Sequence, residues 1–220
     1  MSLATTLAKE GAVRLDRAAL ALLPALEAAL ADLAPDRAGI RLWDRAPLAA
    51  LLDGPIGEIA RTLLPGAQPV RALLFNKTAE TNWALGWHQD RTIAVRARHD
   101  VPGFGAWTVK SGTLHVEPLF ALIERMLTLR VHLDSVDADN APLLVALGTH
   151  RLGRIEDGAI AATVAGAPTI ACTADAGDVW AYATPILHAS DMARSPGARR
   201  VLQVDYSADT LPPPLAWRGV

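Results

Sequence analysis

The first third of the chain carries apolar residues at helical spacing. Leucines recur three or four residues apart over residues 16–33, which places them on one stripe of a helix. Asp16 is suited to the N-cap of this helix, and Pro35 would end it. A second apolar stretch, residues 48–64, is interrupted at residues 53–55 by Asp-Gly-Pro. We expect these helices to form a layer packed on a sheet.

From residue 68 onward the pattern changes to short β-like runs separated by Gly, Pro, Asp and Asn, which is typical of an all-β sandwich or barrel. The runs are residues 69–75, 87–95, 128–134, 143–147, 169–173, 179–182, 186–190 and 199–206. Between them, residues 117–127 and 155–164 predict inserted helices. We therefore expect a single domain over residues 1–220, with a helical N-terminal layer over 1–66 and a β core over 67–220.

Candidate metal chemistry lies in the sequence Gly86-Trp87-His88-Gln89-Asp90. Side chains of a strand alternate between its two faces, so His88 and Asp90 project to the same side and can share one ion. Two ligands alone make a poor site. A distant histidine would complete the two-histidine, one-carboxylate triad of non-haem Fe(II) oxygenases.

The His-x-Asp pattern is weak evidence alone, because a second copy occurs at His132-Leu133-Asp134. In this run Leu129, Val131 and Leu133 form the apolar face. Arg130, His132 and Asp134 therefore share the other face. We expect a polar cluster or a pocket wall there rather than a second metal site.

Several motifs together resemble the phytanoyl-CoA dioxygenase family, the Fe(II)- and 2-oxoglutarate-dependent oxygenases, over roughly residues 70 to 217. They are Phe75-Asn76-Lys77-Thr78, Asn82-Trp83, Trp87-His88-Gln89-Asp90, Leu129-Arg130-Val131-His132-Leu133-Asp134, Gly148-Thr149-His150-Arg151, Ala176-Gly177-Asp178-Val179, and His188-Ala189-Ser190 with Arg199. The resemblance implies a mainly β fold with a double-stranded β-helix core, a jelly roll, and N-terminal and inserted helices packed on one face.

By the same resemblance, His88, Asp90 and His188 bind Fe(II), and O2 and 2-oxoglutarate are co-substrates. The far carboxylate of 2-oxoglutarate is then held by Arg199, eleven residues after His188, with help from Ser190. A guanidinium suits this role because it matches a carboxylate with two parallel hydrogen bonds.

The neighbouring Arg200 is an alternative to Arg199. If residues 194–197 form the hairpin turn, Arg199 falls on the same face as Ser190 and His188, but slipping the register by one residue would present Arg200 instead. The residues alone do not exclude this slip, and the family spacing favours Arg199. Arg200 is then a solvated or salt-bridged neighbour.

Four further residues are candidates for ligand contacts. Lys77 and Asn82 are expected to touch 2-oxoglutarate or the substrate. Gln89, and Trp107 in a Gly-rich loop after the His-x-Asp run, are expected to line the substrate pocket. Since Asp90 fills the position that halogenating relatives leave open for chloride, hydroxylation of a C–H bond in a small-molecule substrate is favoured. The sequence does not identify that substrate.

Two other functions compete with this reading. A non-catalytic, metal-binding sensor of cupin type would keep the histidines but have no use for Arg199. A serine hydrolase would use Ser190 with His188 as base, but Ser190 lacks the Gly-x-Ser-x-Gly elbow of such nucleophiles.

Composition narrows the class further. The formal net charge is −2, and no basic stripe is evident, so nucleic acid is not an expected partner. The sequence contains no run of about eighteen apolar residues, so a membrane span is not expected. Cys172 is the sole cysteine, which excludes an intrachain disulfide and a cysteine-based zinc cluster. The start of the sequence lacks a signal-peptide pattern, and we expect a cytoplasmic protein.

Overall fold

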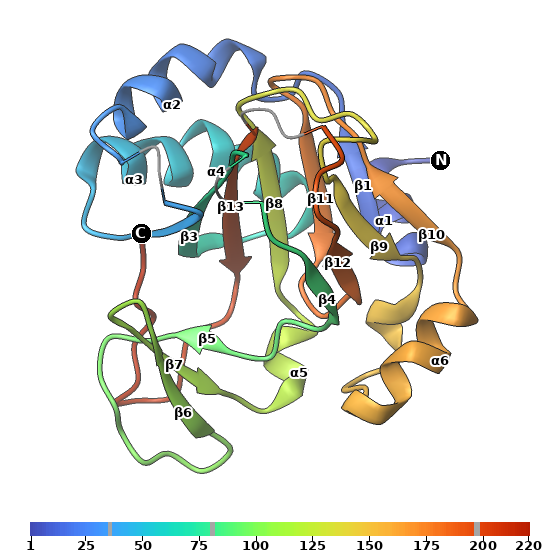
Figure 1. The fold of residues 1–220 in the computed structure, drawn as a ribbon. Coiled ribbons are helices and arrows are strands. Elements are labelled where there is room, and N and C mark those ends of the chain that lie inside the picture. Colours follow the sequence, from blue (N-terminus) through green and yellow to red (C-terminus); the bar gives the residue numbers. More distant parts are fainter. Residues whose placement is uncertain (35–36, 80–81, 196–198) are drawn as a thin grey trace.

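Two antiparallel sheets face each other in the computed structural model of the chain, which describes residues 1–34, 37–79, 82–195 and 199–220 (Figure 1). The larger sheet has six strands in the order β1-β11-β8-β13-β3-β2, and all its neighbours are antiparallel. These strands are β1 (Ala12–Leu15), β11 (Val179–Ala183), β8 (Leu127–His132), β13 (Arg199–Ser207), β3 (Gln68–Lys77) and β2 (Gly39–Leu42).

The facing sheet has four strands in the order β10-β9-β12-β4. They are β10 (Thr169–Cys172), β9 (Leu143–Ala146), β12 (His188–Ser190) and β4 (Leu85–His88). A third, three-stranded sheet is formed by β5 (Ile93–Ala94), β7 (Thr113–Glu117) and β6 (Gly105–Lys110). Two facing antiparallel sheets confirm the predicted mainly β, jelly-roll architecture.

Each of the eight predicted β-like runs contains a strand, but four other strands were not expected. β1 and β2 lie within the segment 1–66, which is therefore not purely helical. They are only four residues long, too short for an alternating pattern to stand out, and they form the two edges of the six-stranded sheet. The expected loop after Asp90 instead contains the β6–β7 hairpin.

The N-terminal helices are α1 (Leu3–Glu10), α2 (Leu23–Leu30), α3 (Ala46–Asp53) and α4 (Pro55–Leu63). The interruption predicted at residues 53–55 is found, since Gly54 separates α3 from α4. The helix predicted from Asp16 begins later, because Arg17 has a positive φ of 56° and its N–H donates to the Asp178 carboxylate. The predicted stop at Pro35 lies outside the described residues.

The main apolar core fills the space between the N-terminal helices and the outer face of the six-stranded sheet. The helices contribute Leu26, Leu48, Leu52 and Ile56, which pack against alternate residues of the central strands, Leu129, Val131, Leu202 and Val204. Figure 1 shows α2, α3 and α4 on this side of the sheet. The prediction that N-terminal helices cover one face is confirmed.

The inserted helices are shorter than predicted and do not share that face. α5 (Phe120–Ile123) and α6 (Ile160–Ala165) replace the longer helices expected over 117–127 and 155–164. Ile160 and Val164 of α6 pack against Trp87 and Leu187, on the side of the four-stranded sheet. Each sheet therefore has its own helical cover.

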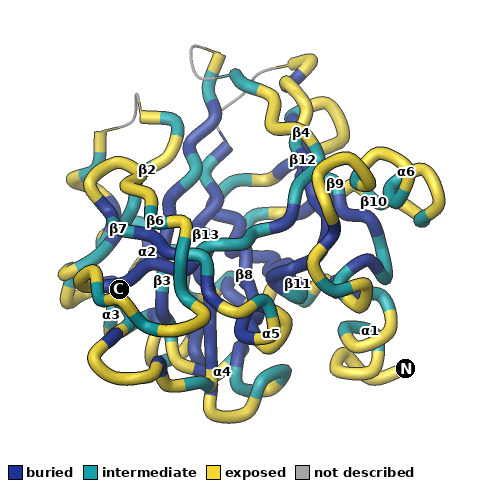
Figure 2. Tube along the Cα trace, turned by 90° about the horizontal axis from the view of Figure 1, so that it is seen from below, coloured by how far each residue is buried: buried dark blue, intermediate teal, exposed yellow. Residues whose placement is uncertain are grey.

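The inner face of the six-stranded sheet is polar, because the alternation that sends leucines outward sends other side chains inward. The side chains that alternation places on the inner face include Arg71 and Lys77 of β3, Arg130 of β8, and Arg199 and Gln203 of β13. Figure 2 shows that these strands are largely buried along their length. The space between the two sheets therefore holds charged and polar side chains beside apolar ones such as Phe75 and Leu143.

None of the helices in the described part of the chain has the length and apolar character that a membrane crossing needs.

Candidate active site

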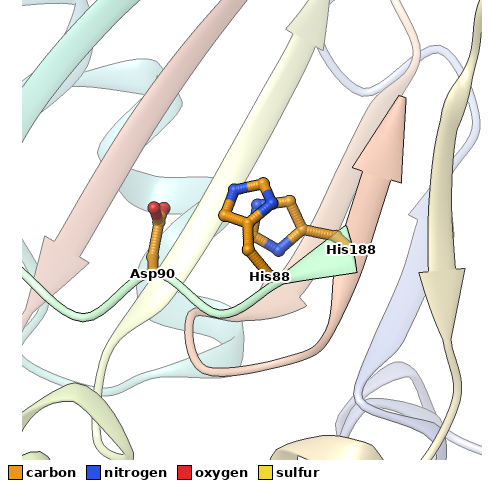
Figure 3. Close-up of side chains that lie close together, drawn as sticks. All are labelled: His88, Asp90 and His188. Carbon is orange, nitrogen blue, oxygen red and sulfur yellow. The ribbon is translucent and has the colours of Figure 1, made fainter. Parts of the chain in front are cut away.

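His88 and His188 face each other across two neighbouring strands. They are directly opposite in the antiparallel pairing of β4 with β12, although the two residues are far apart in sequence. Their ring centroids lie 4.3 Å apart. Figure 3 shows the two rings next to each other. The pairing of these strands thus places two imidazoles side by side at the mouth between the sheets.

Both imidazoles are fixed in the same tautomer. Nδ1 of His88 lies 2.8 Å from the Gly86 carbonyl, and Nδ1 of His188 lies 2.9 Å from the Ile186 carbonyl. A carbonyl only accepts a hydrogen bond, so each Nδ1 carries the proton and each Nε2 keeps a free lone pair. This arrangement is the one that metal-binding histidines use.

Asp90 supplies a carboxylate on the same side as these rings. It follows β4 two residues after His88, and its side chain points in the same direction in Figure 3. One ligand atom from each of His88, Asp90 and His188 lies within 4.8 Å of the others. The three residues predicted from sequence are therefore brought together.

Arg71 holds the Asp90 carboxylate in place from the six-stranded sheet. Its Nη2 lies 3.1 Å from Asp90 Oδ2, and its Nε donates to Asp205. Asp205 also accepts a hydrogen bond of 3.1 Å from the Thr128 hydroxyl. Burial acts to raise the pKa of Asp90, but the positive charge of Arg71, together with smaller contributions from His188, His88 and Lys110, holds the pKa below its usual value.

Burial and the neighbouring His88 lower the pKa of His188 to about 4. At neutral pH, His188 is therefore an uncharged imidazole, which is the form that binds metals. Together the three residues offer two neutral nitrogen donors and one anionic oxygen donor. This donor set fits Fe(II) as non-haem oxygenases bind it, with positions left for other ligands.

The three residues border a cavity between the sheets that contains about 810 Å³ of space, counting its open mouth. Residues from both sheets and from the β6–β7 hairpin line it. The lining consists of Arg41, Arg71, Leu73, Phe75, Trp83, Leu85, His88, Asp90, Lys110, Arg130, Leu143, His188, Ala189, Ser190, Arg199 and Gln203.

Arg199 reaches this cavity as a buried cation, with 3% of its surface exposed. Its Nη1 donates to the Ala141 carbonyl, and its Nε has no partner among the described residues. Burial and the nearby Arg130 lower the pKa of Arg199 to about 9, and no described carboxylate offsets these effects. An anionic ligand would stabilise this guanidinium.

Arg200 points elsewhere. Its guanidinium forms ion pairs of 2.7 Å with both Asp134 and Glu27, at the side of the sheet that faces α2. Asp134 therefore belongs to a surface ion pair, and it is not among the described residues that could group around a metal. The strand register places Arg199 in the cavity and leaves Arg200 outside it.

Lys77 lies opposite Arg199 in the pairing of β3 with β13. Its Nζ donates to the Ser190 hydroxyl at 3.2 Å and to the Asp191 carbonyl at 2.7 Å, and it lies 5.0 Å from the centre of the Trp83 ring. Burial, then the charge of Arg199, lowers the pKa of Lys77 to about 8. Ser190 and Arg199 thus line one end of the cavity, and Lys77 lies behind them, in contact with the Ser190 hydroxyl.

Three predicted contact residues are placed away from the cavity. The Asn82 amide makes two hydrogen bonds with the backbone of Ala193, of 3.0 and 2.7 Å. The buried Gln89 amide, in the residue that directly follows β4, forms hydrogen bonds with the backbone of Gly153, Pro185 and Ile155. Both amides hold loops in place, and neither residue lines the cavity in the described structure, so their expected ligand contacts stay predictions.

Trp107 is the third of these residues. It lies on β6 rather than in a loop, packs against the apolar cluster around Val116 and Ile123, and has Arg98 5.5 Å from its ring centre. It is not among the described residues that line the cavity. Its expected contact with the substrate stays a prediction, without support from its place in the fold.

The sequence reasoning did not single out Arg41, Arg71 or Lys110 as site residues, and it expected Arg130 only as part of a polar cluster or pocket wall. Arg71 shares its strand face with Lys77, six residues on, so strand alternation was an available signal. Arg41 and Lys110 lie on strands that were not predicted. Their approach to the cavity depends on tertiary structure.

Comparison with known proteins agrees with this site. Residues 48–201 match the family model described as Phytanoyl-CoA dioxygenase (PhyH). No curated protein matches the chain.

Solved structures with the same fold include EctD from S. alaskensis in its apoform, with a TM-score of 0.68, 18% identity, and coverage of 100% of this chain and 87% of that one. AviO1 from Streptomyces viridochromogenes has a TM-score of 0.62 and 20% identity, with coverage of 96% and 95%. SnoN from nogalamycin biosynthesis, a non-haem α-ketoglutarate-dependent epimerase, has a TM-score of 0.64 and 16% identity, with coverage of 93% and 79%.

The family model spans well over half of the chain and includes the His-x-Asp strand and the distal histidine. The protein therefore belongs to the phytanoyl-CoA dioxygenase family and is an Fe(II)- and 2-oxoglutarate-dependent dioxygenase.

Proposed function

We propose that this dioxygenase hydroxylates a C–H bond of a small molecule, with His88, Asp90 and His188 as the iron ligands. The observation that carries the proposal is the convergence of these ligand atoms within 4.8 Å, in the same cavity as a buried guanidinium without an acidic partner. A metal-binding sensor would not require Arg199. Bound iron would supply the oxidative chemistry, in which O2 and 2-oxoglutarate are consumed.

Arg199 is proposed to bind the far carboxylate of 2-oxoglutarate, assisted by Ser190 and Lys77. Arg199 has an unpartnered Nε in the described structure, and Lys77 already donates to the Ser190 hydroxyl. A dianion placed here would meet two cations and a hydroxyl, which gives charge-assisted hydrogen bonds. Its keto-acid end would extend toward His188, because Ser190 follows His188 on β12.

Other residues of the cavity would hold the metal ligands in position and keep water away from the reacting groups. The two backbone carbonyls fix the imidazoles, and Arg71 fixes the Asp90 carboxylate, so the ligand atoms need little rearrangement to receive the metal. Phe75 and Leu143 provide apolar walls to the cavity. Such walls protect a reactive site from water.

Hydroxylation is favoured over other outcomes because Asp90 occupies the third ligand position, where chloride would bind in a halogenating relative. A cavity lined by residues of two facing sheets suits a small molecule better than a polymer. EctD from S. alaskensis has been solved with 2-oxoglutarate and 5-hydroxyectoine, a small hydroxylated compound, which is consistent with this class of substrate. SnoN, an epimerase with the same fold, shows that the fold alone does not decide the outcome.

The test is to incubate purified protein with Fe(II), ascorbate and 2-oxoglutarate and to measure succinate and bound iron per chain. We expect one iron per chain and slow formation of succinate even without a substrate. The variant His88→Ala should lose both, whereas His99→Ala, which removes a histidine outside the cavity, should keep both. Absence of 2-oxoglutarate turnover in an iron-loaded protein would overturn the proposal in favour of a sensor.

A further inference from the structure

The cavity carries more positive charge than iron and 2-oxoglutarate require. Five cationic side chains line it against the single carboxylate of Asp90; they are Arg41, Arg71, Lys110, Arg130 and Arg199. If the proposed function holds, Fe(II) and the 2-oxoglutarate dianion bring two charges of each sign, and these cancel. An excess of positive charge therefore remains for the substrate to meet.

Three of the five cations have evident roles. Arg71 is paired with Asp90 and Asp205. Arg130 donates to Gln203 Oε1 at 2.9 Å and lies 5.2 Å from the centre of the Phe75 ring. Arg199 is assigned to 2-oxoglutarate, so Arg41 and Lys110 remain.

Arg41 and Lys110 lie at the other end of the cavity from Arg199. In the six-stranded sheet, Arg199 is paired with Lys77, whereas Arg41 is paired with Leu73, four residues back along β3. At about 3.3 Å per residue this offset is roughly 13 Å. A group bound by Arg41 is therefore distinct from the 2-oxoglutarate carboxylate bound by Arg199.

Neither Arg41 nor Lys110 forms an ion pair with a described residue. Arg41 Nη1 lies 3.0 Å from the Ser111 hydroxyl, and its Nε is buried without a partner in the described structure. Lys110 Nζ donates to the Thr92 hydroxyl at 3.2 Å. Both cations thus keep hydrogen-bond donors free. Burial lowers the pKa of both side chains, and a bound anion would raise these pKa values again.

The β6–β7 hairpin holds these two cations together. Its tip is formed by Ser111 and Gly112, which have positive φ values of 47° and 77°, as a tight hairpin turn requires. Through Ser111, the tip contacts Arg41 of β2, so that the hairpin and the edge of the six-stranded sheet meet at one corner of the cavity. Lys110 precedes this tip and is electrostatically coupled to Asp90.

We propose that Arg41 and Lys110 form a binding site for an oxyanion group, a carboxylate or a phosphate, carried by the substrate. The site would anchor the substrate on the Asp90 side of the metal ligands, opposite the end that holds 2-oxoglutarate. The inference rests on the proposed function and narrows its substrate to anionic small molecules.

The test is a calorimetric titration of inorganic phosphate, and separately of acetate, into protein saturated with 2-oxoglutarate, at constant ionic strength. Saturation occupies the Arg199 end, so remaining binding reports on the other end. We expect at least one of the two anions to bind wild-type protein, and Arg41→Gln and Lys110→Gln each to weaken binding by about tenfold, the typical effect of losing a hydrogen bond to a charged group. The better-binding anion would identify the class.

Matched controls are Arg125→Gln and Lys9→Gln, which remove exposed cations outside the cavity and should leave anion binding unchanged. Lys110→Arg should retain binding, which separates loss of charge from misfolding. Binding of neither anion, or equal binding by wild type, Arg41→Gln and Lys110→Gln, would overturn the inference. Failure of wild-type protein to bind 2-oxoglutarate would instead contradict the proposed function, and the anion titrations without 2-oxoglutarate would still compare the variants.

Discussion

The imidazole rings of His88 and His188 lie 4.3 Å apart on directly opposed residues of β4 and β12, and a backbone carbonyl two residues earlier fixes each ring. Each histidine offers one Nε2 atom to the same candidate metal position, so neither can make up for the loss of the other. His88→Ala or His188→Ala should therefore reduce Fe(II) affinity by far more than a change outside the site.

This first prediction is checked by equilibrium dialysis against Fe(II) under anaerobic conditions. His99→Ala is the control, because it removes an imidazole from a residue outside the cavity. Since the proposed site uses all three residues as ligands, Asp90→Ala should resemble the histidine variants. Full iron occupancy in His188→Ala would show that His188 is not a ligand.

A second prediction concerns Arg71, which lies between the half-buried carboxylate of Asp90 and the buried carboxylate of Asp205. Arg71→Met leaves Asp90 and Asp205 without their cation, and breaking such a buried pair costs about 3–5 kcal/mol of unfolding free energy. Chemical denaturation would measure this loss. The further substitution Asp205→Asn should recover part of the stability, because it removes one of the two uncompensated charges.

The same variant should change the pH dependence of metal binding. Arg71 keeps the pKa of Asp90 below its usual value, so without Arg71 the carboxylate takes up its proton at a higher pH. As pH falls, Arg71→Met should then lose metal at a higher pH than wild type does. Metal titrations at a series of acidic pH values test this, and an unshifted midpoint would exclude control of Asp90 by Arg71.

The third prediction compares two adjacent arginines. Arg199→Gln should weaken 2-oxoglutarate binding by about tenfold or more, because hydrogen bonds between charged groups are lost, while iron binding stays intact. Arg200→Gln should leave 2-oxoglutarate binding unchanged and reduce stability by at most about 1 kcal/mol, since its ion pairs are partly exposed. Calorimetry on both variants decides between them, and a larger effect for Arg200→Gln would mean that the assignment is wrong.

The fourth prediction is that 2-oxoglutarate binding weakens as pH rises through about 8. Burial and Arg199 lower the pKa of Lys77 to about 8, so above this pH Lys77 is neutral and no longer attracts the dianion. Below this pH the ammonium is charged and the attraction is present. Dissociation constants measured from neutral to alkaline pH should rise in wild type and rise less in Lys77→Met; identical profiles would rule out Lys77.

Much of the site could be predicted from the sequence because its signals are local or regular. Strand alternation alone placed His88 and Asp90 on one side, and the structure agrees. The distal members, His188 and Arg199, needed the family spacing, because nothing local shows which strands become neighbours. Their positions follow from two strand pairings, β4 with β12 and β3 with β13.

Other parts could not be predicted, for two physical reasons. The short edge strand β2 and the hairpin strand β6 carry Arg41 and Lys110, and their place beside the cavity is a tertiary property. Gln89 and Asn82 are polar residues close to the motif, but their amides are used by loop backbone. Polar character near a ligand therefore did not distinguish a contact residue from a structural one.

The central claim is that His88, Asp90 and His188 bind one iron next to a 2-oxoglutarate held by Arg199. Anomalous diffraction at the iron edge, from crystals grown anaerobically with Fe(II) and 2-oxoglutarate, tests it most directly. The account predicts one peak within coordination distance of all three ligand atoms, with the ligand's far carboxylate on Arg199. A peak elsewhere, or a carboxylate bound by Arg200, would contradict it.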